Sequence, residues 1–266
     1  MTRPQGIRAT ILGCGSSPGC PVIGCTCAVC TSNDPKNQRS RSSLMLTFPE
    51  GQHVIFDTAT EFRLQMIREG VRNIEHVIYT HTHSDHCHGF DDLRAFFFHS
   101  KNPITIHATK EHLDDLKTRF SYAFQNTAYH GTKPKVILHE IESGVPFKIF
   151  GFDVEPTSVS HGDMTTSVFK IGSFIYATDF KTIPDELVEN WRGKVHTMVA
   201  SGLRMESHPT HSSLPETLAL LDKIKVKQGV ITHLGHELDY QTVNRTLPAN
   251  IRLAFDGLSV VCPVVL

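Results

Sequence analysis

Four potential metal ligands stand within six residues in the stretch His81-Thr82-His83-Ser84-Asp85-His86. The stretch follows a run of strand character at residues 76–80, so His81 and His83 are expected in extended backbone. Side chains two apart in a strand point the same way, and the two imidazoles can therefore converge on one cation. A lone His-x-His is typical of a polar turn, but this density of ligands between an apolar strand and an apolar helix is typical of a metal site.

The remaining ligands of the stretch, Asp85 and His86, fall where a helix is expected to begin. Ser84 or Asp85 is predicted to cap a helix that runs through residues 87–98. Adjacent side chains in this first turn diverge from the pair of histidines at the end of the strand. The geometry therefore favours two metal ions over one.

The pattern H-x-H-x-D-H resembles the defining motif of the metallo-β-lactamase superfamily. The resemblance implies an α+β fold, a four-layer αββα sandwich with a two-metal site on one edge. It also implies three further ligands later in the chain. The sequence supplies a residue at each place, after a strand-like run: His161 after 152–159, Asp179 after 174–177 and His233 after 229–232.

The resemblance also divides the ligands between two metals. One metal is expected on three histidines and the other on an Asp-His-His set, with Asp179 bridging both metals. The two sets are His81, His83 and His161, and Asp85, His86 and His233. Asp57 follows a predicted hairpin at residues 44–56 and matches an acidic position that, in the superfamily, supports the metal loop through hydrogen bonds.

A second cluster, Cys25-Thr26-Cys27-Ala28-Val29-Cys30, has the spacing C-x-C-x-x-C and can fill three sides of a tetrahedral zinc site. With the late stretch 233–239, which reads H-x-x-H-x-x-D, it narrows the resemblance to the PhnP-type cyclic phosphate phosphodiesterases. The resemblance implies that His236 closes a structural zinc site with Cys25, Cys27 and Cys30. Three reduced, buried thiols are the alternative.

Length and composition set the broad class. A chain of 266 residues with 39% hydrophobic content can bury one large core, and we expect one domain over residues 1–266. A net charge of -1 gives no global field for nucleic acid or an anionic membrane. The chain shows no apolar run of about 18 residues, and its start opens into a strand at 7–12 rather than a signal peptide. These features predict a cytoplasmic protein whose seven cysteines are thiols or metal ligands rather than disulfides.

His211 is the predicted proton donor to the leaving group, because the resemblance places a histidine of phosphodiesterase branches here, over the metals. Together with the metal ligand Asp85, it is expected to be catalytic. Ser212 is predicted to cap the amphipathic helix that follows. Arg204 is a candidate phosphate ligand, because a guanidinium can bind phosphate oxygens bidentately, and a surface role is the alternative.

These residues predict a two-metal phosphodiesterase with two catalytic divalent metals, zinc or manganese, and one structural zinc. A hydroxide held between the catalytic cations is expected to attack phosphorus. The resemblance points to a small, cyclic ribosyl phosphodiester as substrate. The main alternative is a tRNA 3′-end processing endonuclease, although no basic arm for RNA is evident.

Two further functions have less support from the sequence. A β-lactamase fits poorly because the bridging Asp179 suits a phosphoester hydrolase, and a non-catalytic binding domain would not need every ligand. The resemblance is compatible with a homodimer. Residues 121–133 are expected to form either a lid over the site or an ordinary surface excursion.

Overall fold

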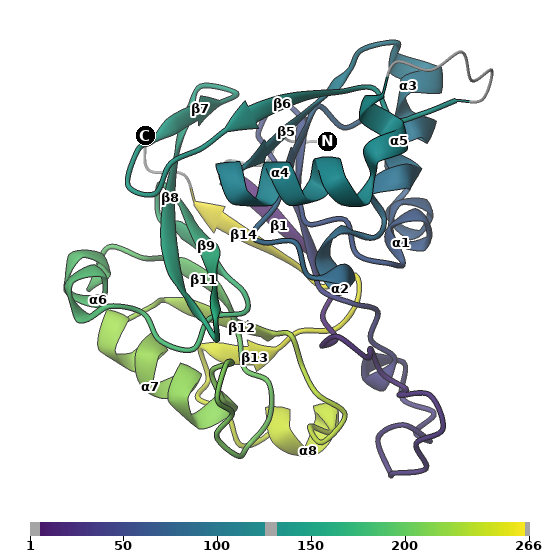
Figure 1. The fold of residues 1–266 in the computed structure, drawn as a ribbon. Coiled ribbons are helices and arrows are strands. Elements are labelled where there is room, and N and C mark those ends of the chain that lie inside the picture. Colours follow the sequence, from purple (N-terminus) through teal and green to yellow (C-terminus); the bar gives the residue numbers. More distant parts are fainter. Residues whose placement is uncertain (1–5, 126–131, 264–266) are drawn as a thin grey trace.

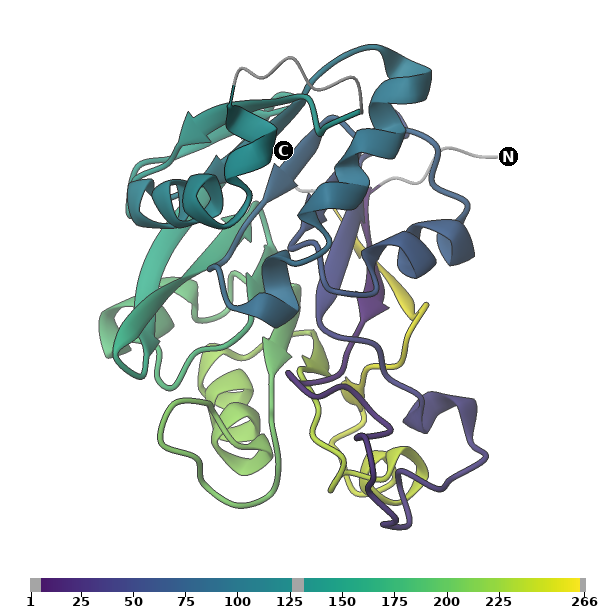
Figure 2. The ribbon, with the colours of Figure 1, turned by 45° about the vertical axis from the view of Figure 1, so that its right-hand side comes forward.

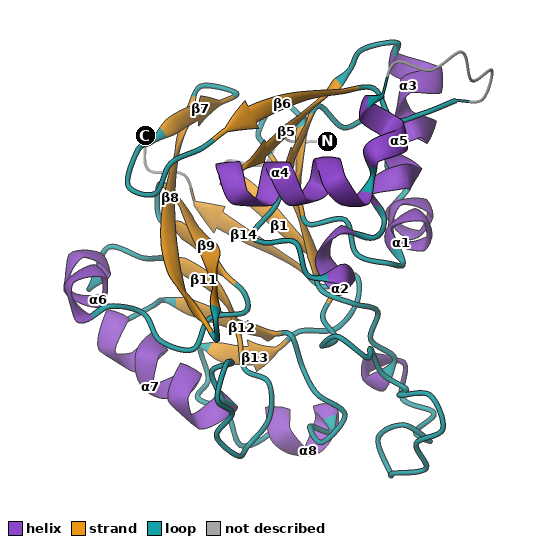
Figure 3. Ribbon diagram, viewed as in Figure 1, coloured by secondary structure: helices purple, strands orange, loops and turns teal. Residues whose placement is uncertain are grey.

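The computed structural model describes residues 6–125 and 132–263. Two seven-stranded sheets face each other, and helices cover their outer faces (Figures 1 and 3). This arrangement confirms the predicted α+β, αββα sandwich. Among the described residues, no helix is long and apolar enough to cross a membrane.

The first sheet combines antiparallel and parallel strands in the order β14-β1-β2-β3-β4-β5-β6. The strands from β3 to β6 run parallel, whereas β1 is antiparallel to both of its neighbours. The bounds are β1 (Gly6–Gly13), β2 (Ser43–Thr47), β3 (His53–Phe56), β4 (His76–Ile78), β5 (Ile104–Ala108), β6 (Val136–Glu140) and β14 (Ser259–Pro263).

The second sheet has the order β13-β12-β11-β10-β9-β8-β7. Its strands from β10 to β13 are parallel, and those from β7 to β10 are antiparallel. The bounds are β7 (Phe147–Ile149), β8 (Phe152–His161), β9 (Met164–Ile171), β10 (Phe174–Ala177), β11 (Thr197–Ser201), β12 (Gln228–Thr232) and β13 (Ile251–Leu253).

The helices divide between the two outer faces (Figure 1). The first sheet carries α1 (Phe62–Glu69), α3 (Arg94–Ser100), α4 (Lys110–Arg119) and α5 (Ser121–Phe124), with α2 (Ser84–Cys87) at its lower edge. The second sheet carries α6 (Asp185–Trp191), α7 (Leu214–Ile224) and α8 (Tyr240–Asn244). Two 3-10 turns, η1 (Pro35–Asn37) and η2 (Phe90–Leu93), lie in connections.

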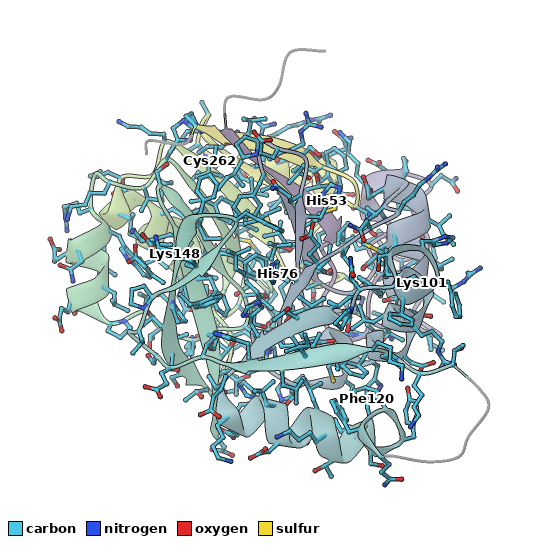
Figure 4. The ribbon with its side chains drawn as sticks, turned by 90° about the horizontal axis from the view of Figure 1, so that it is seen from above. His53, His76, Lys101, Phe120, Lys148 and Cys262 are labelled. Atoms are coloured by element: carbon cyan, nitrogen blue, oxygen red, sulfur yellow. The ribbon has the colours of Figure 1, made fainter. Side chains whose placement is uncertain are left out.

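The core fills the space between the sheets. The ring of Phe56 on β3 lies 5.4 Å from that of Phe169 on β9 and 5.2 Å from that of Tyr176 on β10. Side chains crowd this space when the molecule is seen from above, with His76 among them (Figure 4). A second apolar cluster, which includes Phe62 and Leu113, lies between the first sheet and its helices. Both sheets are therefore held by apolar packing on two faces.

The loops that leave the parallel strands gather at one edge of the sandwich, where we expected the site. Asp57 follows β3, Asp179 follows β10 and His233 follows β12, and these three residues have φ values of 62°, 51° and 53°. Non-glycine residues rarely adopt this left-handed conformation, which costs free energy wherever it occurs. All three lie at the predicted site, which therefore holds three of the six non-glycine residues with positive φ in the described part of the chain.

The long helix predicted after the metal motif is wrong. The chain forms α2, then η2, then α3, and the residue before α2 is His83, which makes no side-chain cap. The break lies at Gly89, where an added Cβ would be 2.3 Å from the carbonyl oxygen of Ala59. The amide of Gly89 donates to the carbonyl of Thr58 at 2.9 Å. The chain therefore passes very close to the loop after β3, and a residue with a side chain at position 89 would collide with it.

The predicted cap of the amphipathic helix that follows residue 212 is wrong by one residue. Ser213, not Ser212, caps α7, and its hydroxyl accepts from the amide of Glu216 while the Glu216 carboxylate accepts from the Ser213 amide. This reciprocal pairing is a capping box. Ser212 instead faces inward, 2.8 Å from the hydroxyl of Thr217.

Part of the proposed lid, residues 126–131, lies outside the described residues. Residues 121–124 form α5, and the rings of Phe120 and Phe124 pack on Phe90 at 4.7 and 5.9 Å. This segment therefore rests on the helical layer of the first sheet. Its role as a lid or as a surface excursion stays a prediction.

Candidate metal centre

Three histidines from distant parts of the chain form the first ligand set. His81 and His83 follow β4, and His161 is the last residue of β8. The Nε2 atom of His81 lies 3.0 Å from Nδ1 of His83, and Nε2 of His161 lies 3.4 Å from that same Nδ1. One nitrogen from each ring therefore faces a common point, as a tetrahedral or octahedral cation requires.

Asp85, His86 and His233, the second predicted ligand set, also lie close together. Oδ2 of Asp85 lies 3.4 Å from Nε2 of His86 and 3.7 Å from Nε2 of His233. The three side chains are buried, and one atom from each lies within 4.8 Å of the others. The side chains of the adjacent residues Asp85 and His86 thus face the same candidate metal position.

Asp179 lies between the two ligand sets. Its Oδ2 is 3.6 Å from Nε2 of His81 and 2.5 Å from Nε2 of His86, and its Oδ1 is 3.0 Å from Nε2 of His233. The carboxylate is 1% exposed. It can therefore supply one oxygen to each of two neighbouring cations.

Several buried atoms of this cluster lie close to polar neighbours but make no hydrogen bond of acceptable geometry among the described residues. They are Nε2 of His86, Oδ1 of Asp179, Nδ1 and Nε2 of His233, and Nδ1 of His211. Buried polar atoms are seldom left unpaired, because each costs about 1–3 kcal/mol. Imidazole and carboxylate groups are ligands for zinc and manganese. The residues therefore fit two divalent metals.

The charges of the cluster also fit cations. Burial opposes ionisation of Asp179, but the neighbouring His233 and His86 hold the pKa of its carboxyl well below the usual range. Burial likewise opposes the charge on His233, yet Asp179 and Asp85 raise its pKa to about 9. An imidazole must be neutral to bind a metal, so loading this centre releases protons.

Asp57 takes the supporting position that the resemblance implied. Its carboxylate lies 2.7 Å from Nδ1 of His86 and accepts from the amide and hydroxyl of Thr80, both at 2.8 Å. Burial raises the pKa of Asp57, although these partners act against the rise. Because this contact occupies Nδ1, Nε2 is the nitrogen of His86 that remains available to a metal. The contact also fixes the orientation of the ring.

His211 reaches the same cluster from the loop before α7. Its Nδ1 lies 3.2 Å from Oδ1 of Asp179, and its ring stacks on His233 at 5.0 Å. Asp179, His211 and His233 also form a group whose ligand atoms lie within 4.8 Å of one another. His211 can therefore be either a proton donor or an additional ligand.

The loop that carries His211 is held by two charged residues. Nζ of Lys181 lies 2.8 Å from the Glu216 carboxylate and 3.5 Å from the carbonyl of His211. Arg204, the candidate phosphate ligand, starts this loop, and its Nη2 donates to the carbonyl of Ser207 at 3.2 Å. Its Nε is buried with no acceptor in the described part of the chain. The role of Arg204 toward phosphate stays a prediction.

The three cysteines meet His236 in a second, separate cluster. Nδ1 of His236 lies 3.3 Å from Sγ of Cys25 and 3.5 Å from Sγ of both Cys27 and Cys30. The Cys30 amide donates to the sulfur of Cys27 and is the main reason that the Cys27 pKa falls to about 6. The seven cysteines are free thiols. Three thiols and one imidazole in this arrangement fit a structural zinc.

Two buried residues near these centres have no counterpart in the sequence analysis. Arg39 is only 2% exposed and contacts the loop between His233 and His236. His112, on α4, is 1% exposed and lies 3.5 Å from the hydroxyl of Thr82 within the metal motif. Neither residue belongs to a recognisable motif, so no signal in the sequence marks them.

Comparisons with known proteins agree with this geometry. Residues 52–234 match the model of the β-lactamase superfamily domain, and the chain belongs to this superfamily. A solved structure described as a new diphosphatase from the PhnP family is 36% identical, with a TM-score of 0.89 over 97% of this chain and 98% of that one. Within the superfamily, the chain therefore belongs to the PhnP family.

Two curated relatives are longer proteins. An octanoyltransferase of Porphyromonas gingivalis is 32% identical over 257 residues, which are 96% of this chain and 51% of that protein. A ribonuclease Z of Crocosphaera subtropica is 28% identical over 136 residues, 49% of this chain and 42% of that protein. The chain thus spans about half the length of the first of these curated relatives, and the second matches over a shorter segment.

Proposed function

We propose that the chain is a metal-dependent hydrolase that cleaves a phosphodiester or diphosphate bond in a small molecule. The observation that carries the proposal is the convergence of the two ligand sets on Asp179 at one edge of the sandwich. The PhnP-family diphosphatase supports phosphate chemistry. A small, cyclic ribosyl phosphodiester is the substrate that the sequence motifs favour.

The residues around the cluster have different roles in the proposed reaction. Two divalent metals, zinc or manganese, would supply a Lewis acid and an activated water here. His83 is exposed and leaves an approach for substrate, whereas the other ligands are buried and keep bulk water out. Since Nδ1 of His211 faces Asp179, its Nε2 is the atom available to protonate the departing oxygen.

The thiol cluster has a structural part in this proposal. A zinc ion on Cys25, Cys27, Cys30 and His236 would hold the loop of residues 14–41, hereafter the cysteine loop, against the chain after β12. In Figure 2 this purple loop lies beside α8. The side-chain amide of Asn37 donates to the Asp239 carboxylate at 2.8 Å, so the two segments are in direct contact.

RNA is the second candidate substrate, supported by the ribonuclease Z relative. A net charge of -1 provides little of the counterion release that drives binding to a polyanion. The small-molecule proposal is therefore favoured.

A substrate panel tests the proposal. The metal-loaded protein and Asp179→Ala would be assayed on ribosyl cyclic phosphate, a 2′,3′-cyclic nucleotide, a dinucleoside diphosphate, an aryl phosphodiester, precursor tRNA and a β-lactam. We expect hydrolysis of at least one small phosphate ester or anhydride, and none by the variant. Activity confined to precursor tRNA would favour the second candidate, and activity confined to the β-lactam would contradict both.

A further inference from the structure

One short loop serves both clusters. His233 follows β12 and faces Asp179, and His236 faces the three cysteines. Only two residues separate them, and His233 has the strained φ of 53°. A shift of this loop would therefore move a ligand of each centre at the same time.

Arg39 holds this loop from the side of the cysteine loop. Its Nη1 donates to the carbonyl of Gly235 at 2.7 Å, and its Nη2 donates to the carbonyl of Leu238 and, at 3.0 Å, to Oδ1 of Asn37. Two of these acceptors lie within the stretch that carries His236. The planar guanidinium thus fixes two backbone carbonyls on either side of one ligand.

The surroundings of Arg39 make this contact rigid. The side chain is 2% exposed, so water cannot replace its partners. Asn37 is 0% exposed and accepts from the Tyr240 amide while its own amide donates to Asp239. On its other side the loop is held by the amide of Gly235, which donates to the carbonyl of Leu203 at 2.8 Å. The loop is clamped between the cysteine loop and the segment that leads to His211.

We propose that Arg39 is a positioning residue that couples the thiol centre to the two-metal centre through the loop from His233 to Asp239. The inference rests on the proposed function only in requiring that the two-metal centre bind metal. A metal on the thiols would fix the position of His236. The hydrogen bonds from Arg39 would then hold the rest of the loop, and with it His233, in place. By linkage, a metal at His233 must tighten metal binding on the thiols by the same factor.

Matched variants separate this role from general stability. Arg39→Met keeps a side chain of similar length and removes every donor, and Arg39→Lys keeps the charge but loses the planar pair of donors. Arg41→Met is the control, because Arg41 contacts Ser17 and Glu61 and not the loop. Each protein would be titrated with cobalt(II), whose thiolate absorption reports the cysteine centre, while chelator competition measures affinity at the two-metal centre.

We expect Arg39→Met to weaken metal binding at the two-metal centre by about 10- to 100-fold, as loss of an outer hydrogen-bonding partner typically does. Arg39→Lys should lie between this value and the wild type, and Arg41→Met should match the wild type. If Arg39→Met does not fold, as judged by circular dichroism, Arg39→Lys carries the same comparison.

A double-mutant cycle tests the coupling itself. Cys27→Ser should also lower the metal affinity of the two-metal centre. In the double variant with Arg39→Met, the fold-loss of affinity should be smaller than the product of the two single fold-losses. Full multiplication of the two effects, or Arg39 variants that bind metal like Arg41→Met, would overturn the inference. A wild type that holds metal only on its thiols would instead overturn the proposed function, so the two failures are distinguishable.

Discussion

The two metal clusters are built in opposite ways. The two-metal centre takes its ligands from the segment after β4, which includes α2, from the end of β8 and from the loops after β10 and β12, so two packed sheets hold them in place. The thiol centre takes three ligands from one surface loop whose buried apolar cluster is only Cys20, Val29 and Cys30. Ile23 in that loop is 97% exposed.

The difference shows what holds the ligands of each site in place. A site fixed by a large core keeps its geometry without metal and can keep open coordination positions for chemistry. The apolar cluster of the cysteine loop contains only these three buried side chains, and so little apolar burial offsets little of the entropy lost on folding, so a bound metal is expected to supply part of that free energy. The first centre should therefore depend on metal for activity and the second for structure.

Removal of the bridging ligand should have the largest effect. Asp179→Ala takes away the carboxylate shared by both ligand sets, and metal catalysis contributes several kcal/mol, so activity should fall by about 10⁴-fold. Thermal unfolding should change little in comparison, because the sheets remain packed. Parallel measurement of turnover and melting temperature checks this, and retained turnover would contradict the bridging role.

His211→Ala should have the next largest effect. General acid catalysis contributes about 10²- to 10⁴-fold, so turnover of a substrate with a poor alkoxide leaving group should fall by this amount while both metals stay bound. An aryl phosphodiester, whose nitrophenolate needs little protonation, should lose far less. Equal losses on both substrates would mean that His211 positions the phosphate, and loss of metal would make it a ligand.

Asp57→Asn should act through His86 rather than on substrate. The amide keeps the shape but loses the charge that orients the Nδ1 side of the ring, 2.7 Å away. Metal affinity at the two-metal centre should fall by about 10- to 100-fold. Chelator competition measures this affinity, and Arg41→Met, whose side chain contacts Ser17 and Glu61, is the control. An unchanged affinity would show that the sheets alone orient His86.

A third group of histidines, outside both clusters, differs from them in geometry. His76, His107 and His139 lie on neighbouring strands, with ring nitrogens 3.0 and 3.1 Å apart along the row. Each N–N contact pairs one donor with one acceptor, and the rings do not converge on a common point. Burial lowers the pKa of His107 to about 3. This row of histidines therefore lacks the convergent geometry of the two metal clusters.

The sign of the resulting pH effect follows from that depressed pKa. The unfolded chain takes up a proton at His107 near pH 6.5, while the folded chain resists it until about pH 3. Stability contributed by the neutral ring is present above pH 6.5 and is lost as the pH falls from there toward 3. Between pH 6.5 and 5.5 the free energy of unfolding should drop by about 1 kcal/mol.

Urea unfolding of the wild type and His107→Gln over this pH range checks the effect. The variant has no ring to titrate at this position and should lose that part of the pH dependence, while contributions from both metal centres cancel in the difference. Identical slopes for the two proteins would assign the acid sensitivity to other groups.

Much of the fold and of the two-metal centre could be predicted from the sequence. The H-x-H-x-D-H stretch is local, and strand runs such as 174–177 match β10. The four ligands of this stretch do meet in space, together with His161, Asp179 and His233. Their action as metal ligands stays a prediction. The pairing of the three cysteines with His236, more than 200 residues away, came only from the resemblance.

The features that the sequence did not predict depend on tertiary contacts. The helix break at Gly89 exists because the loop after β3 approaches that backbone. Arg39 is an ordinary basic residue in the sequence and is buried only because the chain near Gly235 folds against it. Local propensity carries no information about these two approaches. The choice of Ser213 over Ser212 as the cap is an exception, because Ser213 and Glu216 have the local S-x-x-E spacing of a capping box.

The central claim is that the chain holds two separate metal centres, one for chemistry and one for structure. Metal content per chain, measured at a free-metal concentration well above the affinity of the weaker centre, tests it most directly. The wild type should hold two metals at the cluster around Asp179 and one on the thiols, and Cys27→Ser should lose only the thiol-bound metal and melt at a lower temperature. Two metals per chain in both proteins, with equal melting temperatures, would contradict the account.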